Sequence, residues 1–403
     1  MKNYLEADTD VTELFRRHGL HEFALLDASG TLTERNNRWS FHVHAFRNWV
    51  KQLRHASMTY LERNQNVRAE PKMLLEGMSS SFVFLIPYGT GQFIRGRHLD
   101  ADERQQLPTG LMARVARYAR FRDYHRLIHK KLDAAFAELA ELTASKQEKF
   151  NKSDSCQPAF QFRVVVDSIP FMDRAHAHLA GLGFFGKNTL LIRPGLGSYF
   201  FIASVLCTAP AENFGRLLTR DSALRRTSEL GCGDCQKCIE ACPTGALLGD
   251  YSMDAAKCFA YTSIEHKGIV REREIAHFKD LFFGCDICQE VCPYNVRTRD
   301  GRHWSELRVP ESRLGALELQ DVATMSRAQY ESWFGGLPLT RAKYPGLVRN
   351  ALYGLYASGD APGLARAMLH WQNVRINGVG FDCPQEIINV IDQIETLQRG
   401  QTN

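Results

Sequence analysis

The sequence predicts a chain in three parts: an α/β or α+β domain, a small cysteine-rich domain and a C-terminal α-helical segment. Helical and strand-like patterns mix through the first 210 residues, which is typical of those two fold classes. Eight of the eleven cysteines fall between residues 232 and 292, and the pattern is helical again from about residue 304. Because 403 residues exceed one compact core, we expect domains at 1–215, 216–300 and 301–403.

Most of the predicted elements lie in the N-terminal part. The first 60 residues or so have a helical pattern. His42 and His44 lie two apart and would face different ways on a helix, so polar packing is expected there rather than metal binding. An amphipathic helix is predicted within 105–142, followed by a polar loop at 143–158. A further helix is predicted at 171–180, and strands are predicted at 81–87, 163–166, 190–192 and 199–206.

The C-terminal part contains a predicted helix pair, at 347–357 and 362–371, separated by Ser358-Gly359-Asp360. Such a pair suggests a HEAT-like helical repeat, although no second copy follows at a fixed period. The tail after residue 372 does not extend into further repeats.

The cysteine-rich part carries the strongest chemical signal in the chain. Residues 232–243 read Cys-Gly-Asp-Cys-Gln-Lys-Cys-Ile-Glu-Ala-Cys-Pro, the run of bacterial ferredoxins whose fourth cysteine ligates the other cluster. A second run is split: Cys285, Cys288 and Cys292 supply its last three positions, and Cys258 is the most economical first position. We therefore predict two [4Fe–4S] clusters, one on Cys232, Cys235, Cys238 and Cys292, the other on Cys258, Cys285, Cys288 and Cys242.

Two other interpretations of these patterns are less favoured. Pairs of cysteines two residues apart also make zinc sites, but the doubled run with Cys-Pro endings is typical of iron–sulfur proteins. Gly181, Gly183 and Gly186 match the dinucleotide-binding fingerprint, yet a helical pattern precedes them and a strand-like pattern follows, the reverse of the required order. Those glycines are better explained as a helix cap and a tight turn.

The charge and hydropathy of the sequence limit the kinds of partner that the protein can have. The net charge of +5 permits a nucleic-acid partner without requiring one. Residues 114–131 carry seven basic residues and one acid, which indicates either a solvated helix face or a surface that meets phosphate. No secretory signal is visible, and no stretch approaches the ~20 apolar residues of a membrane helix. We expect a cytoplasmic protein without a membrane partner.

Several segments, in order along the chain, resemble the cobalamin-dependent, iron–sulfur epoxyqueuosine reductases of tRNA modification. The split cysteine runs are one such feature, with Cys258 opening Phe259-Ala260-Tyr261-Thr262-Ser263-Ile264-Glu265-His266-Lys267-Gly268 between them. The flanking segments are Tyr60-Leu61-Glu62-Arg63-Asn64, Arg68-Ala69-Glu70-Pro71, Arg122-Asp123-Tyr124-His125, Val166-Asp167-Ser168-Ile169-Pro170, Gly181-Leu182-Gly183-Phe184-Phe185-Gly186-Lys187-Asn188-Thr189-Leu190-Leu191, Arg341-Ala342-Lys343 and Arg349-Asn350-Ala351.

The resemblance implies a corrinoid-binding N-terminal domain, a two-cluster ferredoxin-like domain and a helical C-terminal domain that helps to hold tRNA. It implies reductive removal of the epoxide oxygen of epoxyqueuosine at the anticodon wobble position, which gives queuosine. An external donor such as a flavodoxin or ferredoxin would supply electrons, which pass through the clusters to cobalamin. The family's acid falls on Asp167, and the expected corrin contacts are Arg68, Tyr124, His125, Asp167, Asn188 and Ser198.

Chemistry supports the role implied for Asp167. Cleaving an epoxide C–O bond with two electrons leaves an oxygen that needs a proton, and a carboxylic acid buried against a corrin would have a raised pKa. Without the resemblance, Asp167 would be interpreted as a turn residue. The chain has no Asp-x-His-x-x-Gly motif, so no histidine is expected to ligate cobalt. Arg341, Lys343 and Arg349 are expected to form a basic cluster that contacts the tRNA anticodon stem-loop.

Two further functions stay open at this point: a corrinoid and iron–sulfur reductase of another substrate, as in reductive dehalogenases, and an electron-transfer protein without a substrate of its own. The sequence also departs from the family. Residues 260–265 replace the usual Ser-Tyr-Leu-Thr-Ile-Glu, the first 60 residues match poorly, and residues 143–158 have the character of an insertion.

Overall fold

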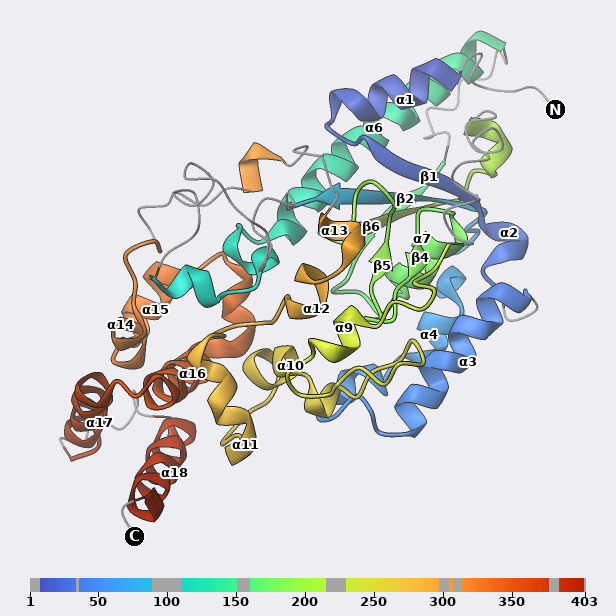
Figure 1. Cartoon of the computed structure of the whole chain (residues 1–403). Helices are drawn as coiled ribbons and strands as arrows, with labels where there is room; N and C mark the ends of the chain where they lie inside the picture. Colours follow the sequence, from blue (N-terminus) through green and yellow to red (C-terminus); the bar gives the residue numbers. More distant parts are fainter. Residues whose placement is uncertain are drawn as a thin grey trace.

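A four-stranded antiparallel sheet with helices on both faces forms the N-terminal part of the computed structural model (Figure 1). The structure describes residues 8–33, 36–88, 110–150, 160–214, 230–296, 304–307, 314–376 and 384–401. The strand order is β1 (Glu22–Asp27), β2 (Ser80–Pro87), β6 (Phe200–Cys207) and β3 (Phe162–Val166), and each pair is antiparallel. The mixed α/β content predicted from the sequence is confirmed, and the antiparallel pairing makes the domain α+β.

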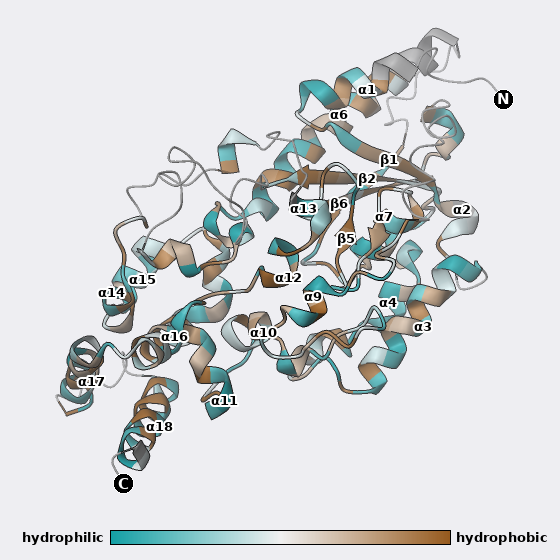
Figure 2. Cartoon of the chain, viewed as in Figure 1, coloured by the Kyte–Doolittle hydropathy of each residue, from teal (hydrophilic) through white to brown (hydrophobic). Residues whose placement is uncertain are grey.

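The alternation of side chains along β2 explains the three layers. Phe82 and Phe84 pack against α1 (Asp8–Arg17) and α6 (Tyr124–Phe150) on one face. Val83 and Leu85 point to the opposite face. Helices α2 (Ala28–Thr31), α3 (Asn37–Lys51), α4 (Gln65–Ala69) and α7 (Asp173–Leu179) belong to that second side. Figure 2 shows the hydrophobic residues of β2 at the centre of these layers.

Three predictions about this part need correction. Strand β1 lies inside the stretch predicted to be helical. Glu22–Asp27 contains helix-forming Ala and Leu and does not alternate apolar with polar residues, so the local pattern favours a helix. Pairing with β2 makes the segment a strand instead. Residues 110–120 form 3₁₀ turns, η4 (Gly110–Arg114) and η5 (Arg117–Arg120), so the basic stretch 114–131 is no single helix. Helix α6 continues to Phe150, into the predicted loop.

The glycine-rich segment forms a small hairpin. Gly181 takes a φ of 77° just after α7, and β4 (Phe184–Phe185) then pairs with β5 (Leu191–Ile192). The prediction that these glycines end a helix and allow a tight turn is confirmed.

Residues 230–296 lie between the sheet and the C-terminal helices (Figure 1). They form short helices joined by turns: α9 (Lys237–Glu240), α10 (Phe259–Ile264), α11 (Glu272–Ile275), α12 (Ile287–Glu290) and α13 (Pro293–Val296), with the 3₁₀ turns η7 (Ala255–Lys257) and η8 (Ala276–Lys279). Pro293 begins α13, where its missing N–H and fixed φ are tolerated.

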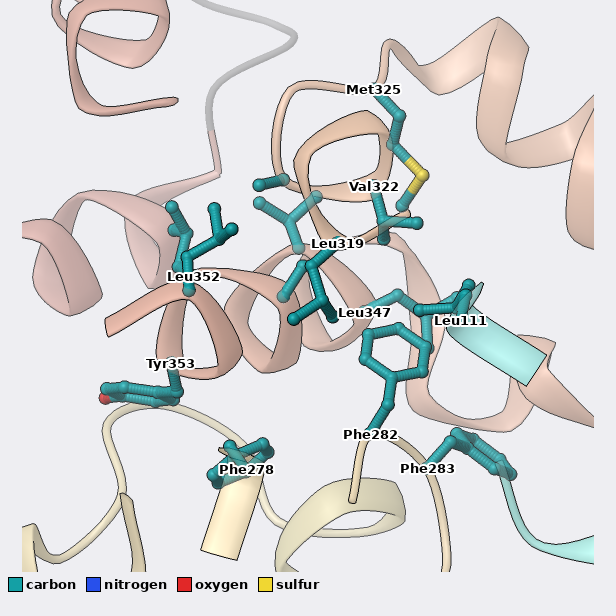
Figure 3. Packing of buried hydrophobic residues seen from close by; sticks show 14 of the residues in the cluster. Leu111, Phe278, Phe282, Phe283, Leu319, Val322, Met325, Leu347, Leu352 and Tyr353 are labelled. Atoms are coloured by element: carbon teal, nitrogen blue, oxygen red, sulfur yellow. The ribbon is translucent and has the colours of Figure 1, made fainter. Parts of the chain in front are cut away.

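The C-terminal part is helical, as predicted: α14 (Leu319–Ala323), α15 (Arg327–Phe334), α16 (Lys343–Ser358), α17 (Ala361–Ile376) and α18 (Gln385–Gln401). Helix α16 is buried along most of its length, and Figure 3 shows Leu347 and Tyr353 against Leu319, Phe278 and Phe282. Helix α18, which the sequence analysis did not predict, packs on α16. No described helix is both long and apolar enough to cross a membrane.

Candidate active site and cluster sites

Four thiols gather around one cavity beside the β4–β5 hairpin. Lys187, Asn188 and Tyr294 line this cavity. The thiols that line it are those of Cys232, Cys235, Cys238 and Cys292. Burial raises the pKa of Cys238, and the nearby Cys232 and Cys292 raise it further. The group therefore joins three cysteines of the first run to the last cysteine of the second.

A second group of thiols lies next to the first. Burial raises the pKa of Cys285 to about 12, and Cys258 and Cys242 also act on it. Cys288 is half-buried, and its pKa is raised by desolvation and by the nearby Cys285 and Cys258, with a smaller effect from Cys238 of the first group. The second group is thus Cys242, Cys258, Cys285 and Cys288. The two groups coincide with the two predicted sets, so each group takes three cysteines from one run and its fourth from the other run.

Each group brings together four thiols from the two cysteine runs, which is the ligand number of a [4Fe–4S] cluster. Backbone amides also point at sulfur: Lys187 N lies 3.4 Å from Cys232 Sγ, and Ala246 N lies 3.3 Å from Cys242 Sγ. Such N–H···S bonds tune the potential of an iron–sulfur cluster.

A group of polar side chains surrounds Asp167, directly after β3. The imidazole Nε2 of His125 lies 2.5 Å from Asp167 Oδ1, and the Tyr124 hydroxyl donates to Asp167 Oδ2. On its other side, His125 Nδ1 lies 2.7 Å from Asp123 Oδ1. The Tyr124 ring stacks on Phe201 at a centroid distance of 3.8 Å. A strand end and a helix start therefore bring two carboxylates, an imidazole and a phenol into one chain of hydrogen bonds.

The first turn of α6 explains how these side chains are held. Asp123 Oδ1 also accepts from the backbone N–H of His125 at 3.1 Å, which caps the helix. The hydrogen bond to Asp123, and then that to Asp167, raises the pKa of His125 to about 9. The same contact lowers the pKa of Asp123. Burial and the charge of Asp167 raise the pKa of Tyr124, so its hydroxyl stays protonated as a donor.

Two buried polar atoms near Asp167 have no protein partner among the described residues. They are Nε of Arg68 and Oδ1 of Asp173. Arg68 does donate from Nη1 to the carbonyl of Phe171 at 3.0 Å. Burial, and then the charge of Asp167, raises the pKa of Asp173 to about 8. Buried polar groups normally find partners, so these atoms indicate a place where a polar ligand completes the site.

Comparison with known proteins identifies the family. Residues 68–168 match the family model described as "Epoxyqueuosine reductase QueG, DUF1730", and residues 231–295 match a "4Fe-4S double cluster binding domain". The chain is 33% identical to the epoxyqueuosine reductase of Pseudomonas aeruginosa over 321 residues, which are 80% of this chain and 79% of that one. The chain belongs to the epoxyqueuosine reductase family. The corresponding protein of Xanthomonas campestris is 31% identical over 79% of each chain.

Solved structures of epoxyqueuosine reductases share the fold. The enzyme of Streptococcus thermophilus gives a TM-score of 0.68 at 22% identity, covering 93% of this chain and 86% of that one. A selenomethionine-labelled epoxyqueuosine reductase gives 0.71 at 20% identity, covering 97% and 99%. A third structure, also with a TM-score of 0.68, holds an epoxyqueuosine-modified tRNA-Tyr stem-loop. Neither of the other two functions considered from sequence is favoured by these relatives.

Within this epoxyqueuosine reductase fold, the predicted corrin contacts separate into two groups. Tyr124 and His125 lie together with Asp167, and Arg68 lies near it across Asp173. Ser198 and Asn188 instead contact the cluster-bearing segment: the Ser198 hydroxyl donates to Gln289 Oε1 at 2.9 Å, and Asn188 Nδ2 donates to Cys288 O at 3.4 Å. Their corrin contacts stay a prediction. Asp123 and Asp173 were missed, although Asp123 lies inside a quoted family segment.

The expected basic cluster of the helical domain is wrong in one member. Arg349 is 0% exposed and donates to the carbonyls of Thr262 and His266, so it cannot meet phosphate. Its position on α16, which is buried on nearly all sides, explains this. Arg341 is exposed but forms a two-pronged ion pair with Glu265 at 2.7 and 3.1 Å. Arg117, in the basic stretch of the N-terminal part, is also buried.

Proposed function

We propose that this protein reduces epoxyqueuosine to queuosine at the wobble position of a tRNA anticodon, with electrons passing through two [4Fe–4S] clusters to a bound cobalamin. The observation that carries the proposal is the hydrogen-bonded group at Asp167 in a chain that also holds the two groups of four thiols. Tyr118 is close enough to both Asp286, in the second cysteine run, and Asp167 for their charges to raise its pKa, after burial.

The residues present fit both kinds of cofactor. The two groups of four thiols would each hold one cluster. The partnerless atoms of Arg68 and Asp173 suit a ligand with many amide groups, such as a corrin, placed beside Asp167. Cobalamin, when bound, supplies the low-valent metal that transfers electrons to the epoxide. The N-terminal domain would be the corrinoid domain, and the C-terminal helices would be HEAT-like.

The chain's own residues supply the protons. Removal of an epoxide oxygen consumes two electrons and two protons, and the oxygen leaves as water while a carbon–carbon double bond forms. In this proposal Asp167 is the general acid that protonates the departing oxygen. The Tyr124 hydroxyl and the His125 ring hold one oxygen each of its carboxyl group, which fixes the carboxyl plane. No histidine of this chain is expected to ligate cobalt.

The proposed partner is a tRNA anticodon stem-loop in the cytoplasm, since a structure of a related enzyme holds such a stem-loop. The wobble base would have to leave the stacked loop to reach Asp167. Tyr60 is 43% exposed, and Arg341 lies over its ring at 5.5 Å, which provides an aromatic and cationic surface for RNA. An external flavodoxin or ferredoxin would deliver electrons, for which the exposed residues around Cys232 and Cys235 offer a short route.

An anaerobic assay tests the proposal. Protein reconstituted with iron, sulfide and cobalamin is expected to contain about eight irons, from two four-iron clusters, and to convert an epoxyqueuosine stem-loop to queuosine with loss of one oxygen by mass spectrometry. A stem-loop that already carries queuosine serves as the control. A reconstituted protein that binds both cofactors but leaves the epoxide intact with a strong reductant would contradict the proposed substrate.

A further inference from the structure

His125 lies between two carboxylates, and this sets a minimum for the number of protons that the group holds. Nδ1 is 2.7 Å from Asp123 Oδ1, and Nε2 is 2.5 Å from Asp167 Oδ1. A neutral imidazole carries one N–H and can donate to one carboxylate only. Two such contacts therefore require a second proton, on the ring or on a carboxyl group. The line from Nε2 to Asp167 Oδ1 thus carries a proton that can move between the two residues.

The other groups around this line do not compete for that proton. Tyr124 donates to Asp167 Oδ2, and burial raises its pKa, so it keeps its own proton. Tyr118, whose pKa burial also raises, faces Asp167 from η5. Asp173 faces Asp167 from α7, and Arg126 acts on Asp123 from α6. Exchange along the line therefore involves Asp167 and His125.

The exposed fractions of the side chains give the line a direction. Asp123 is 40% exposed and His125 is 33% exposed, so the chain of hydrogen bonds from Asp167 through His125 reaches solvent at Asp123. Asp167 is 51% exposed, on the side where a substrate has to lie if it is to receive a proton. When substrate covers Asp167, protons can still reach that carboxyl from behind, through the imidazole.

We propose that Asp123, His125 and Asp167 form a proton relay that re-protonates Asp167 within each turnover; this inference rests on the proposed function. The reaction needs two protons, but Asp167 carries at most one. The relay starts with both N–H protons on the His125 ring and one proton on the Asp167 carboxyl group. Asp167 gives its proton to the departing oxygen, and the Nε2 proton of His125 then moves to Asp167 Oδ1. Asp167 passes this second proton to the oxygen, and water leaves. His125 keeps its Nδ1–H toward Asp123, and both Nε2 and Asp167 regain a proton from solvent once the product has left.

The raised pKa of His125 gives the relay a pH signature. The hydrogen bond to Asp123, then that to Asp167, raises this pKa to about 9. The charged ring is therefore present below pH 9 and is lost as the pH rises through that value. Turnover should fall along an alkaline limb near pH 9. Asp123 is a positioning residue in this scheme, because it acts only through His125.

Asp123→Asn tests this role with little change to the fold, because asparagine caps a helix as well as aspartate. The variant weakens the hydrogen bond that does most to raise the pKa of His125, because it replaces a charged acceptor with a neutral amide. We expect its alkaline limb to move to lower pH by at least about one unit, since a hydrogen bond to a charged partner is stronger than one to a neutral amide. Asp133→Asn, which removes the same charge from an exposed position of α6, should leave the limb in place.

Two measurements decide the outcome. One is single-turnover conversion of the stem-loop by the pre-reduced holoprotein across pH 6 to about 10. The other is an NMR titration of ¹⁵N-histidine in the holoprotein with both clusters oxidised, where His125→Gln identifies the resonance. An ordinary pKa of about 6.5 for His125, or an alkaline limb that Asp123→Asn leaves unchanged, overturns the relay. If the wild type does not convert the RNA, the proposed function fails, and the titration still shows whether His125 is held charged.

Discussion

Two polar networks in this protein use similar groups and differ in what their surroundings allow. Around Arg349, every described contact is a hydrogen bond to a carbonyl, an amide or Glu386, and the guanidinium is fully buried. Around Asp167, the carboxyl is half exposed, and Nε of Arg68 and Oδ1 of the nearby Asp173 have no partner within the part of the chain that the structure describes. A closed network holds helices together, whereas an open one is available for a ligand and for proton transfer.

The largest expected effect tests the open network. Asp167→Asn should lower turnover by about 10²–10⁴-fold, because a general acid contributes that much. The thermal midpoint should fall only slightly, because Asp167 is half exposed although it accepts from Tyr124 and contacts His125, and the iron content should stay within error of wild type. Ser168→Ala, at the next position of the same turn, is the matched control. Turnover within a few-fold of wild type would make Asp167 a turn residue only.

The closed network around Arg349 predicts the opposite result, a loss of stability rather than a direct loss of turnover. Arg349→Met keeps the volume but leaves the carbonyls of Thr262 and His266 without their donor. We expect about 3 kcal/mol of destabilisation in urea unfolding, because buried acceptors lose their partners. Arg366→Met, at an exposed position of α17, should cost little. A stable Arg349→Met protein with weakened RNA binding would show that Arg349 is exposed and contacts RNA.

A smaller effect separates packing from hydrogen bonding at Tyr124. Tyr124→Phe keeps the ring that stacks on Phe201 but removes the hydroxyl that donates to Asp167. A hydrogen bond to a charged group is worth about 1.5–3 kcal/mol, so turnover should fall roughly 10-fold or somewhat more. Tyr330→Phe, on α15, controls for loss of a phenol. Loss of cobalamin from Tyr124→Phe, seen in the visible spectrum, would instead show that the hydroxyl holds the cofactor.

The smallest effect concerns Lys343, which is exposed at the start of α16. Lys343→Ala should weaken stem-loop binding a few-fold and lower the slope of log affinity against log salt by about one unit, the loss of one phosphate contact. Lys343 has a φ of 66°, and alanine has the same Cβ constraint, so the change isolates the charge. An unchanged salt slope would show that Lys343 does not contact phosphate.

The sequence predicted best what depends on short spacing. The cysteine runs, the helix cap at Gly181 and the strand before Asp167 are local patterns, and the thiols group in space as the spacing indicates. Burial was harder to foresee. Arg349 and Lys343 both stand among apolar and small residues in sequence, and only the packing of α16 separates a buried charge from an exposed one.

Strand β1 and Asp123 show two other limits. The residues of β1 favour a helix locally, and only pairing with β2, over 50 positions later along the register, makes them a strand. Asp123 was visible as part of a family segment, but its role depends on Asp167, which a separate strand brings to the same place. Both features depend on contacts between segments that are far apart in the sequence, and local patterns do not show such contacts.

The crossed grouping of the thiols has a consequence for biosynthesis. The first group includes Cys292, which is the last of the eight cysteines to leave the ribosome. Neither four-thiol set is complete before translation reaches the second run, because the second set needs Cys285 and Cys288 and the first needs Cys292. A nascent chain that ends before Cys288 therefore offers only incomplete sets to a cluster-delivering machinery, and one that ends between Cys288 and Cys292 offers the second set alone. Maturation of both sites is thus a late event, and a truncated chain is left without a complete pair.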